Sequence, residues 1–162
     1  MTKVHCSCLA VAALVASAGL AVAGPAGPVV IYSNISGHAS SLVPGLGGVS
    51  FTSFDRPYRS PNGDYWIISA LTSAPAAEDE VVIAGFGLAG AVVAREGGAL
   101  NGTTDLIGLI DRRLSINDAG SFVFATNTNG NAAADEAIIS GSIVGGGGLS
   151  IAVLEGDGVV LD

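Results

Sequence analysis

A carboxylate followed directly by two aromatic side chains is the first place where this sequence could do chemistry. Asp64, Tyr65 and Trp66 stand in the stretch SPNGDYWIIS. Aromatic rings with a polar neighbour make good contacts with sugars, and two carboxylates at a suitable separation hydrolyse glycosides. We therefore take these three residues as a candidate glycan-binding site. The competing interpretation, which we favour, places Trp66 in the core of a strand.

The stretch NTNGNAAADE suggests a second chemistry, calcium binding. Asn127, Asn129 and Asp135 surround a glycine, and calcium prefers carboxylate and amide oxygens as ligands. The spacing lacks the regular carboxylates of an EF-hand loop. We favour an ordinary turn rich in Asn and Gly, and we predict no cofactor other than this calcium candidate.

Catalysis by a nucleophile needs a reactive side chain with a base beside it. After residue 23 the sequence has one histidine, His38, and it contains no G-x-S-x-G motif. The two cysteines are Cys6 and Cys8, so zinc would lack its usual ligands in the rest of the chain. We predict no catalytic residue and favour a non-enzymatic chain, although the question of an enzyme stays open.

A glycine motif raises a third chemistry, nucleotide binding. Gly85, Gly87 and Gly90 have the spacing of a dinucleotide-binding loop, and Asp111 ends a later apolar run, near where a ribose-binding acid belongs. A helix must follow such a loop, yet the Gly97–Gly98 pair would end it too early. A dinucleotide-binding fold is our third interpretation, behind a hairpin turn between two strands.

The elements that would position these residues occur twice along the chain. Four segments of the first half recur in the same order in the second half, at a nearly constant offset. The pairs are Phe54–Arg56 with Ile110–Arg112, Ser60–Asn62 with Ser115–Asn117, Asp79–Gly85 with Asp135–Gly141, and Val93–Gly97 with Ala152–Gly156. A constant order and spacing indicate a duplication, and a period near 56 suits β-repeat or propeller-like units.

Each half predicts four short strands. The chain has 24 glycines and 12% charged residues, and β-branched residues dominate its apolar set, which suits strands joined by tight turns. The predicted strands are 49–54, 65–71, 81–84 and 91–95 in unit 1 (49–97), and 106–111, 121–126, 137–140 and 149–154 in unit 2 (98–157). The second strand of each unit is apolar on both faces, so we expect both faces to be covered. We predict an all-β fold of two degenerate four-stranded repeats, either sandwich-like or resembling an incomplete β-propeller.

Some residues recur at matching places and are therefore expected to have structural roles. An arginine that braces a turn through charge-assisted hydrogen bonds would serve each unit equally. These residues are Asp55, Arg56 and Glu96 in unit 1, and Asp111, Arg112 and Glu155 in unit 2.

The stretch NDAGSFVF, Asn117 to Phe124, resembles the NxxGxxAF-type tandem repeat of secreted bacterial choice-of-anchor proteins. The resemblance implies structural roles for Asn117, Gly120 and Phe124, a turn after Glu96 or Glu155 that closes each unit, and a function that is uncharacterised in the family. Val123 stands where the motif usually has Ala. Since the chain stops at VLEGDGVVLD without an anchor, we interpret residues 158–162 as the tail of a truncated array.

The N-terminus predicts export. Lys3 precedes an apolar run that ends in Ala21-Val22-Ala23, the pattern of a signal peptide cleaved near Ala23. Residues 1–23 are therefore the predicted signal and 24–48 a lead segment, which predicts a secreted or extracytoplasmic protein. The remaining chain has five arginines and no lysine against 14 acidic residues, a net charge of −9 that argues against nucleic acid and anionic membranes as partners.

Together these features predict an exported, non-enzymatic β-repeat module of the cell envelope or extracellular space, for surface interaction or scaffolding. Its expected partners are a glycan or another envelope protein. Open sheet edges would also allow self-association through edge strands. The alternative is part of a carbohydrate-active or other hydrolytic enzyme whose further repeats are missing.

Overall fold

The computed structural model describes residues 29–132, 134–145 and 148–157. The predicted signal peptide (1–23) and the predicted tail (158–162) lie outside these residues. The described part is all-β apart from one 3-10 turn, η1 (Ala39–Ser41), as predicted for the fold class. Its helical content includes no segment long and apolar enough to cross a membrane.

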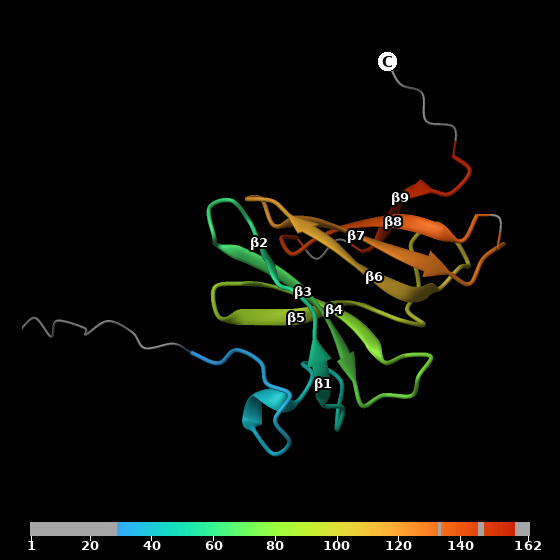
Figure 1. Cartoon of the computed structure of the whole chain (residues 1–162). Coiled ribbons are helices and arrows are strands. Elements are labelled where there is room, and N and C mark those ends of the chain that lie inside the picture. Colours follow the sequence, from blue (N-terminus) through green and yellow to red (C-terminus); the bar gives the residue numbers. More distant parts are fainter. Residues whose placement is uncertain (1–28, 133, 146–147, 158–162) are drawn as a thin grey trace, which may run out of the picture.

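The strands form two antiparallel sheets (Figure 1). Sheet 1 has the order β1-β3-β4-β5, with the short β2 also paired to β3. Its strands are β1 (Phe51–Phe54), β2 (Tyr58–Arg59), β3 (Tyr65–Thr72), β4 (Glu80–Phe86) and β5 (Ala89–Arg95). Sheet 2 has the order β6-β7-β8-β9, with β6 (Ile107–Ile116), β7 (Ser121–Thr128), β8 (Glu136–Ser142) and β9 (Ser150–Leu154).

All eight predicted strands are present, together with one additional strand and one strand that extends well past its predicted end. The short strand β2 was not predicted, and β6 continues to Ile116 instead of ending at Asp111. The charged Arg112 and Arg113 interrupt the apolar pattern in the middle of β6, so its second half is not recognisable as a strand from the sequence. The pairing with β7 also shifts register there. Leu114 and Ile116 of that second half are buried, so β6 contributes to the core along its whole length.

The two sheets match at several positions that lie 56 residues apart. Trp66 lies opposite Gly85 in sheet 1, and Phe122 lies opposite Gly141 in sheet 2. In both sheets the aromatic ring occupies the space that a Cβ on the glycine would need. A register shift follows Val82 in sheet 1 and Ile138, its counterpart, in sheet 2. These matches allow each face of sheet 1 to be compared with one face of sheet 2.

We name the faces after one residue of the second long strand. In sheet 1, Ile67 lies on one face and Trp66 on the other. In sheet 2, Val123 lies on the face that corresponds to Ile67, and Phe122 on the face that corresponds to Trp66, because side chains alternate along a strand. The four faces are therefore the Ile67 face and the Trp66 face of sheet 1, and the Val123 face and the Phe122 face of sheet 2.

The sheets stack with the Ile67 face against the Phe122 face. Ile67 and Val82 share one buried cluster with Phe122, Phe124 and Ile139. On its other side, the Trp66 face is covered by the segment before β1, which contributes Val43 and Tyr32 to a second cluster. Figure 1 shows the resulting three layers: N-terminal segment, sheet 1 and sheet 2.

The fourth face, the Val123 face of sheet 2, is open. The expectation that both second strands are covered on both sides holds for β3 and is wrong for β7. Val123 is 39% exposed, Ile138 38% and Val153 44%. The cause is that no described segment packs over this face, although its residue types resemble those of the covered Ile67 face.

Candidate functional site

The Val123 face of sheet 2 is the candidate functional site, and its centre is apolar. Val123 and Ala125 on β7 point to the same side as Ile138 on β8 and Val153 on β9. The register places Ala125 opposite Ile138, and Ile138 opposite Val153. Contiguous exposed apolar side chains of this kind commonly mark an interaction surface.

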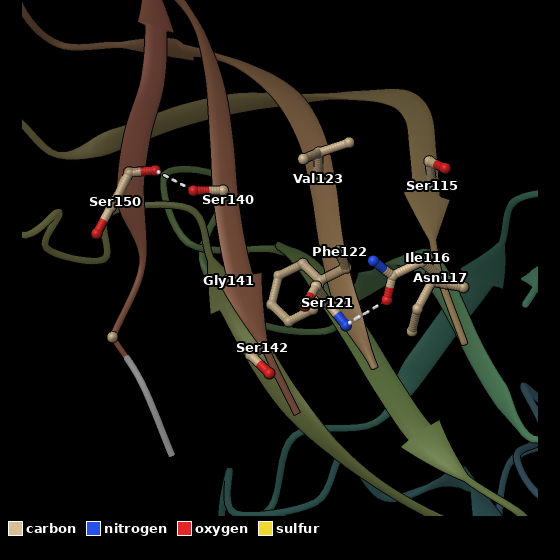
Figure 2. Close-up of a pocket in the computed structure, with 11 residues that line it drawn as sticks. Ser115, Ile116, Asn117, Ser121, Phe122, Val123, Ser140, Gly141, Ser142 and Ser150 are labelled. Atoms are coloured by element: carbon tan, nitrogen blue, oxygen red, sulfur yellow. Dashed lines mark hydrogen bonds between the residues drawn. The ribbon is translucent and has the colours of Figure 1, made fainter. Parts of the chain in front are cut away.

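One end of this face is a shallow hollow rich in hydroxyl groups. It has a volume of about 460 Å³ and lies over the ends of all four strands. Figure 2 shows Ser115, Val123, Ser140 and Ser150 on neighbouring strands, and the register makes them one row across the sheet. The Ser140 hydroxyl donates to the Ser150 carbonyl oxygen at 3.4 Å. The row offers hydrogen bonds, while none of the residues that line the hollow is a base able to activate a serine.

The other end of the Val123 face is charged. A second hollow, of about 360 Å³, is lined by Asp111, Arg113, Glu136 and Glu155 together with apolar residues of the centre. Arg113 Nε lies 3.3 Å from Asp111 Oδ2, and both side chains are largely exposed. Exposed pairs of this kind contribute little to stability, so Asp111 remains able to take another partner.

The counterparts of these acids in sheet 1 hold sheet 2 in place. Asp55 occupies in unit 1 the position of Asp111 in unit 2, and its Oδ1 lies 3.1 Å from Arg112 Nε on β6. Glu80 occupies the position of Glu136, and its Oε2 accepts a hydrogen bond from the Ile110 backbone N–H at 2.5 Å. The Val123 face thus presents the same kinds of groups that sheet 1 uses to bind sheet 2.

An acidic cluster lies where the sheets meet. Burial raises the pKa of Glu80, the Ile110 N–H opposes this, and the negative charges of Glu96, Asp79 and Asp55 add to the increase. Burial also raises the pKa of Glu96, and Asp79 adds to it. Within the described part of the chain, Glu96 Oε2 is buried without a hydrogen-bond partner. The acidic side chains therefore repel one another where the sheets meet, and the apolar contacts between the sheets must offset this repulsion.

The predicted glycan-binding residues do not converge on one site. Tyr65 points toward sheet 2, with its ring 5.2 Å from that of Phe86. Trp66 points the other way, is nearly buried, and donates from Nε1 to the Gly87 carbonyl oxygen at 2.9 Å. Asp64 lies exposed in the turn before β3, where its Oδ2 accepts from Asn62 Nδ2 at 3.1 Å.

Trp66 borders a different hollow, between the N-terminal segment and sheet 1. Its volume is about 720 Å³, and Tyr32, Asp55 and Arg59 also line it. The Tyr32 and Trp66 rings meet edge to face, with centroids 5.9 Å apart. This arrangement supplies aromatic surface, one carboxylate and one guanidinium, but the carboxylate is already paired with Arg112.

Two of the predicted calcium ligands already accept hydrogen bonds from the backbone. Asn129 Oδ1 accepts a hydrogen bond from the Leu106 N–H at 2.6 Å, and the Asp135 carbonyl oxygen accepts one from the Thr128 N–H at 2.6 Å. Asn127 lies at the end of β7, paired with Glu136. The described residues contain no cluster of three or more acidic, histidine or cysteine side chains that could hold a metal ion. Calcium binding by this loop stays a prediction.

The glycines of the nucleotide motif form the turn between β4 and β5. Gly87 has a φ of 57° and lies between the two strands. Because a strand follows Gly87 where a helix would be required, the dinucleotide-binding interpretation is wrong. His38 is the N-cap residue of η1, and its Nδ1 accepts a hydrogen bond from the Ser40 N–H at 3.2 Å.

The predicted structural residues lie mostly at turns and at the interface. Asn117 Oδ1 accepts hydrogen bonds from the backbone N–H groups of Ala119 and Ser121, both at 3.0 Å, in the turn before β7. Gly120 closes that turn with a φ of 74°, and Phe124 is buried between the sheets. Arg56 is exposed. The backbone N–H groups of Glu96 and Glu155 donate to Glu80 and Glu136, respectively.

No family model matches the chain, and neither the curated proteins nor the solved structures contain a match.

Proposed function

We propose that the chain is an exported, non-enzymatic interaction module of the cell envelope or extracellular space, built from two copies of one β-repeat unit. One observation carries the proposal. The Val123 face exposes aliphatic and acidic side chains whose counterparts in sheet 1 form the contact with sheet 2. The resemblance of Asn117–Phe124 to NxxGxxAF-type repeats of secreted bacterial proteins supports the same proposal.

The chemistry of the two hollows favours binding over catalysis. Their walls consist of hydroxyl groups, two asparagines, apolar side chains, three acids and one arginine. Such groups make hydrogen bonds, apolar contacts and ion pairs with a partner. An apolar centre surrounded by polar groups is also the usual anatomy of a protein interface.

The test is sedimentation of the purified chain with a bacterial envelope fraction, before and after the fraction is treated with protease. We expect the chain to sediment with the untreated fraction only, because the proposed partner is a protein. The double variant Val123→Arg/Ile138→Arg is expected to stay in solution. Leu88→Arg, in the exposed turn between β4 and β5, is the matched control and should behave as the unaltered chain does. Equal sedimentation of the double variant and the control would contradict the proposal.

A carbohydrate-active enzyme is the second candidate function, favoured by the aromatic hollow beside Trp66. Glycoside hydrolysis commonly uses two carboxylates, and Asp55 is the one acid among the residues that line this hollow. The hollow therefore suits sugar binding better than cleavage. Release of reducing sugar from a polysaccharide panel, lost in Asp55→Asn, would establish the enzyme, whereas sugar binding without release would leave a binding module.

A further inference from the structure

We propose that the Val123 face binds the Phe122-type face of another four-stranded unit built like sheet 2. The inference deepens the proposed function and rests on it, since it names the partner of the interaction module. It comes from the internal correspondence of the two sheets. Sheet 1 binds sheet 2 through its Ile67 face, and the Val123 face is the matching face of sheet 2.

The apolar part of the contact is present on both matching faces. In sheet 1, Ile67 and Val82 are fully buried and Ala94 is 4% exposed, all against sheet 2. In sheet 2, Val123, Ile138 and Val153 occupy the corresponding positions on three adjacent strands. Ile138 lies opposite Val153, and Val123 lies one row further along the same face, opposite Ser140. These three aliphatic side chains would fit a partner that carries aromatic side chains like Phe122 and Phe124.

The polar part of the contact specifies the chemistry of the partner further. Asp55 receives an arginine of the next sheet, and Glu80 receives a backbone N–H of the same strand. Their counterparts Asp111 and Glu136 lie exposed at the edge of the Val123 face. A partner strand in which an arginine follows a free N–H, as Arg112 follows Ile110, would satisfy both acids.

A second copy of this chain does not offer such a face. Its Trp66 face is covered by the N-terminal segment, with Tyr32 packed against Trp66. Its Phe122 face is covered by sheet 1. The required occupant is therefore a unit whose Phe122-type face is free.

The experiment replaces residues 157–162 of the chain with a second copy of residues 98–157, joined directly after Gly156. Gly97 and Gly156 have similar φ values, 75° and 84°, and each follows the glutamate that comes after the last strand of a sheet. The junction therefore repeats the natural connection between the sheets. Cys6→Ser/Cys8→Ser is the background, and Ile138→Cys in the original unit reports on the Val123 face through its rate of labelling by a maleimide.

We expect the extension to slow labelling at position 138 by about tenfold or more, since a tethered unit has a high effective concentration. Leu88→Cys, in the exposed β4–β5 turn of sheet 1, should label at the same rate in both chains. An unchanged rate at position 138 would overturn the proposal, whether the added copy folds or not.

A charge exchange tests the polar part separately. In the extended chain, Asp111→Arg should return labelling at position 138 toward the rate of the unextended chain, because it faces Arg112 of the added copy. Arg112→Asp in the added copy should restore protection. If neither change altered the labelling rate at position 138 in the extended chain, the predicted partner chemistry would be overturned.

Self-association is the remaining outcome to exclude. We expect the unextended chain to sediment as a monomer with position 138 reactive at all concentrations. A dimer that protects position 138 would show that the Val123 face pairs with itself, which contradicts the proposal. Failure of the envelope sedimentation assay leaves this labelling result unaffected, so the two proposals fail separately.

Discussion

The Ile67 face of sheet 1 and the Val123 face of sheet 2 have similar residues and opposite environments. Val82 on the first is fully buried, whereas Ile138, its counterpart on the second, is 38% exposed. Both are β-branched, and both lie beside a register shift, Val82 in the β4–β5 pair and Ile138 in the corresponding β8–β9 pair. The difference comes from the layer above each sheet, so burial here is decided by the neighbouring unit and not by the strand itself.

The other two faces show the converse. The Trp66 face is covered by an irregular segment and the Phe122 face by a complete sheet, yet both place an aromatic ring over a glycine. The same type of face can therefore pack either against an irregular segment or against a sheet. Five changes, each made in both sheets or on both faces, test how far the correspondence extends.

The largest effect is expected from a charge on the covered face. Val82→Asp places an unpaired carboxylate between the sheets and should unfold the chain or cost more than about 4 kcal/mol. Ile138→Asp, its counterpart, should change the free energy of unfolding by less than about 1 kcal/mol. Chemical denaturation measures both, and equal losses would show that the Val123 face is not open.

Truncation of neighbouring side chains on β7 separates the two faces of one strand. Phe124→Ala leaves a cavity between the sheets and should cost about 3–5 kcal/mol. Val123→Ala removes exposed methyl groups and should cost less than about 1 kcal/mol. If both truncations gave the same midpoint in urea, β7 would have to be covered on both sides.

The acid pair gives a smaller contrast. Asp55→Ala removes the ion pair with Arg112 and the hydrogen bond from the Ser69 hydroxyl, and should cost about 1 kcal/mol because Arg112 is largely exposed. Asp111→Ala loses only an exposed pair with Arg113 and should be close to neutral. A double-mutant cycle of Asp55 with Arg112 measures the first interaction directly, and zero coupling would contradict it.

The smallest effect concerns pH. Because the pKa values of Glu80 and Glu96 are raised in the folded state, their contribution to stability is fully present at low pH and is lost as the pH rises through those folded pKa values. Above this window Glu96→Gln should raise the Tm slightly and flatten its dependence on pH. Glu155→Gln, at the exposed counterpart, should do neither. If Glu96→Gln lowered the Tm at pH 7 relative to the unaltered chain, the raised pKa assigned to Glu96 would be contradicted.

The sequence predicted the strands well because their signals are local. Alternation of apolar residues and glycine-rich turns identify β3, β4, β7 and β8, while β2 is too short and the middle of β6 too charged to be recognised. Exposure of Val123 was not predictable, because an apolar residue on a two-sided strand gives no sign of what lies opposite. The roles of Glu80 and Glu136 were missed as well, although their recurrence within Asp79–Gly85 and Asp135–Gly141 was the available signal.

The glycan candidates show a different limit. Adjacent residues in a strand point to opposite faces, so Tyr65 and Trp66 were separated as soon as both were placed in one strand. Their proximity in the sequence therefore does not bring the two side chains to one surface. The acids that do share a surface, Asp111 and Glu136, come from different strands.

The most direct measurement compares cysteine reactivity at corresponding positions of the two sheets. In the Cys6→Ser/Cys8→Ser chain, Ile138→Cys should react with a maleimide as fast as Leu88→Cys. Val82→Cys should react more than about a hundredfold more slowly, because labelling requires the sheets to separate. Similar slow rates at positions 82 and 138 would contradict an open Val123 face, and with it the docking of another unit.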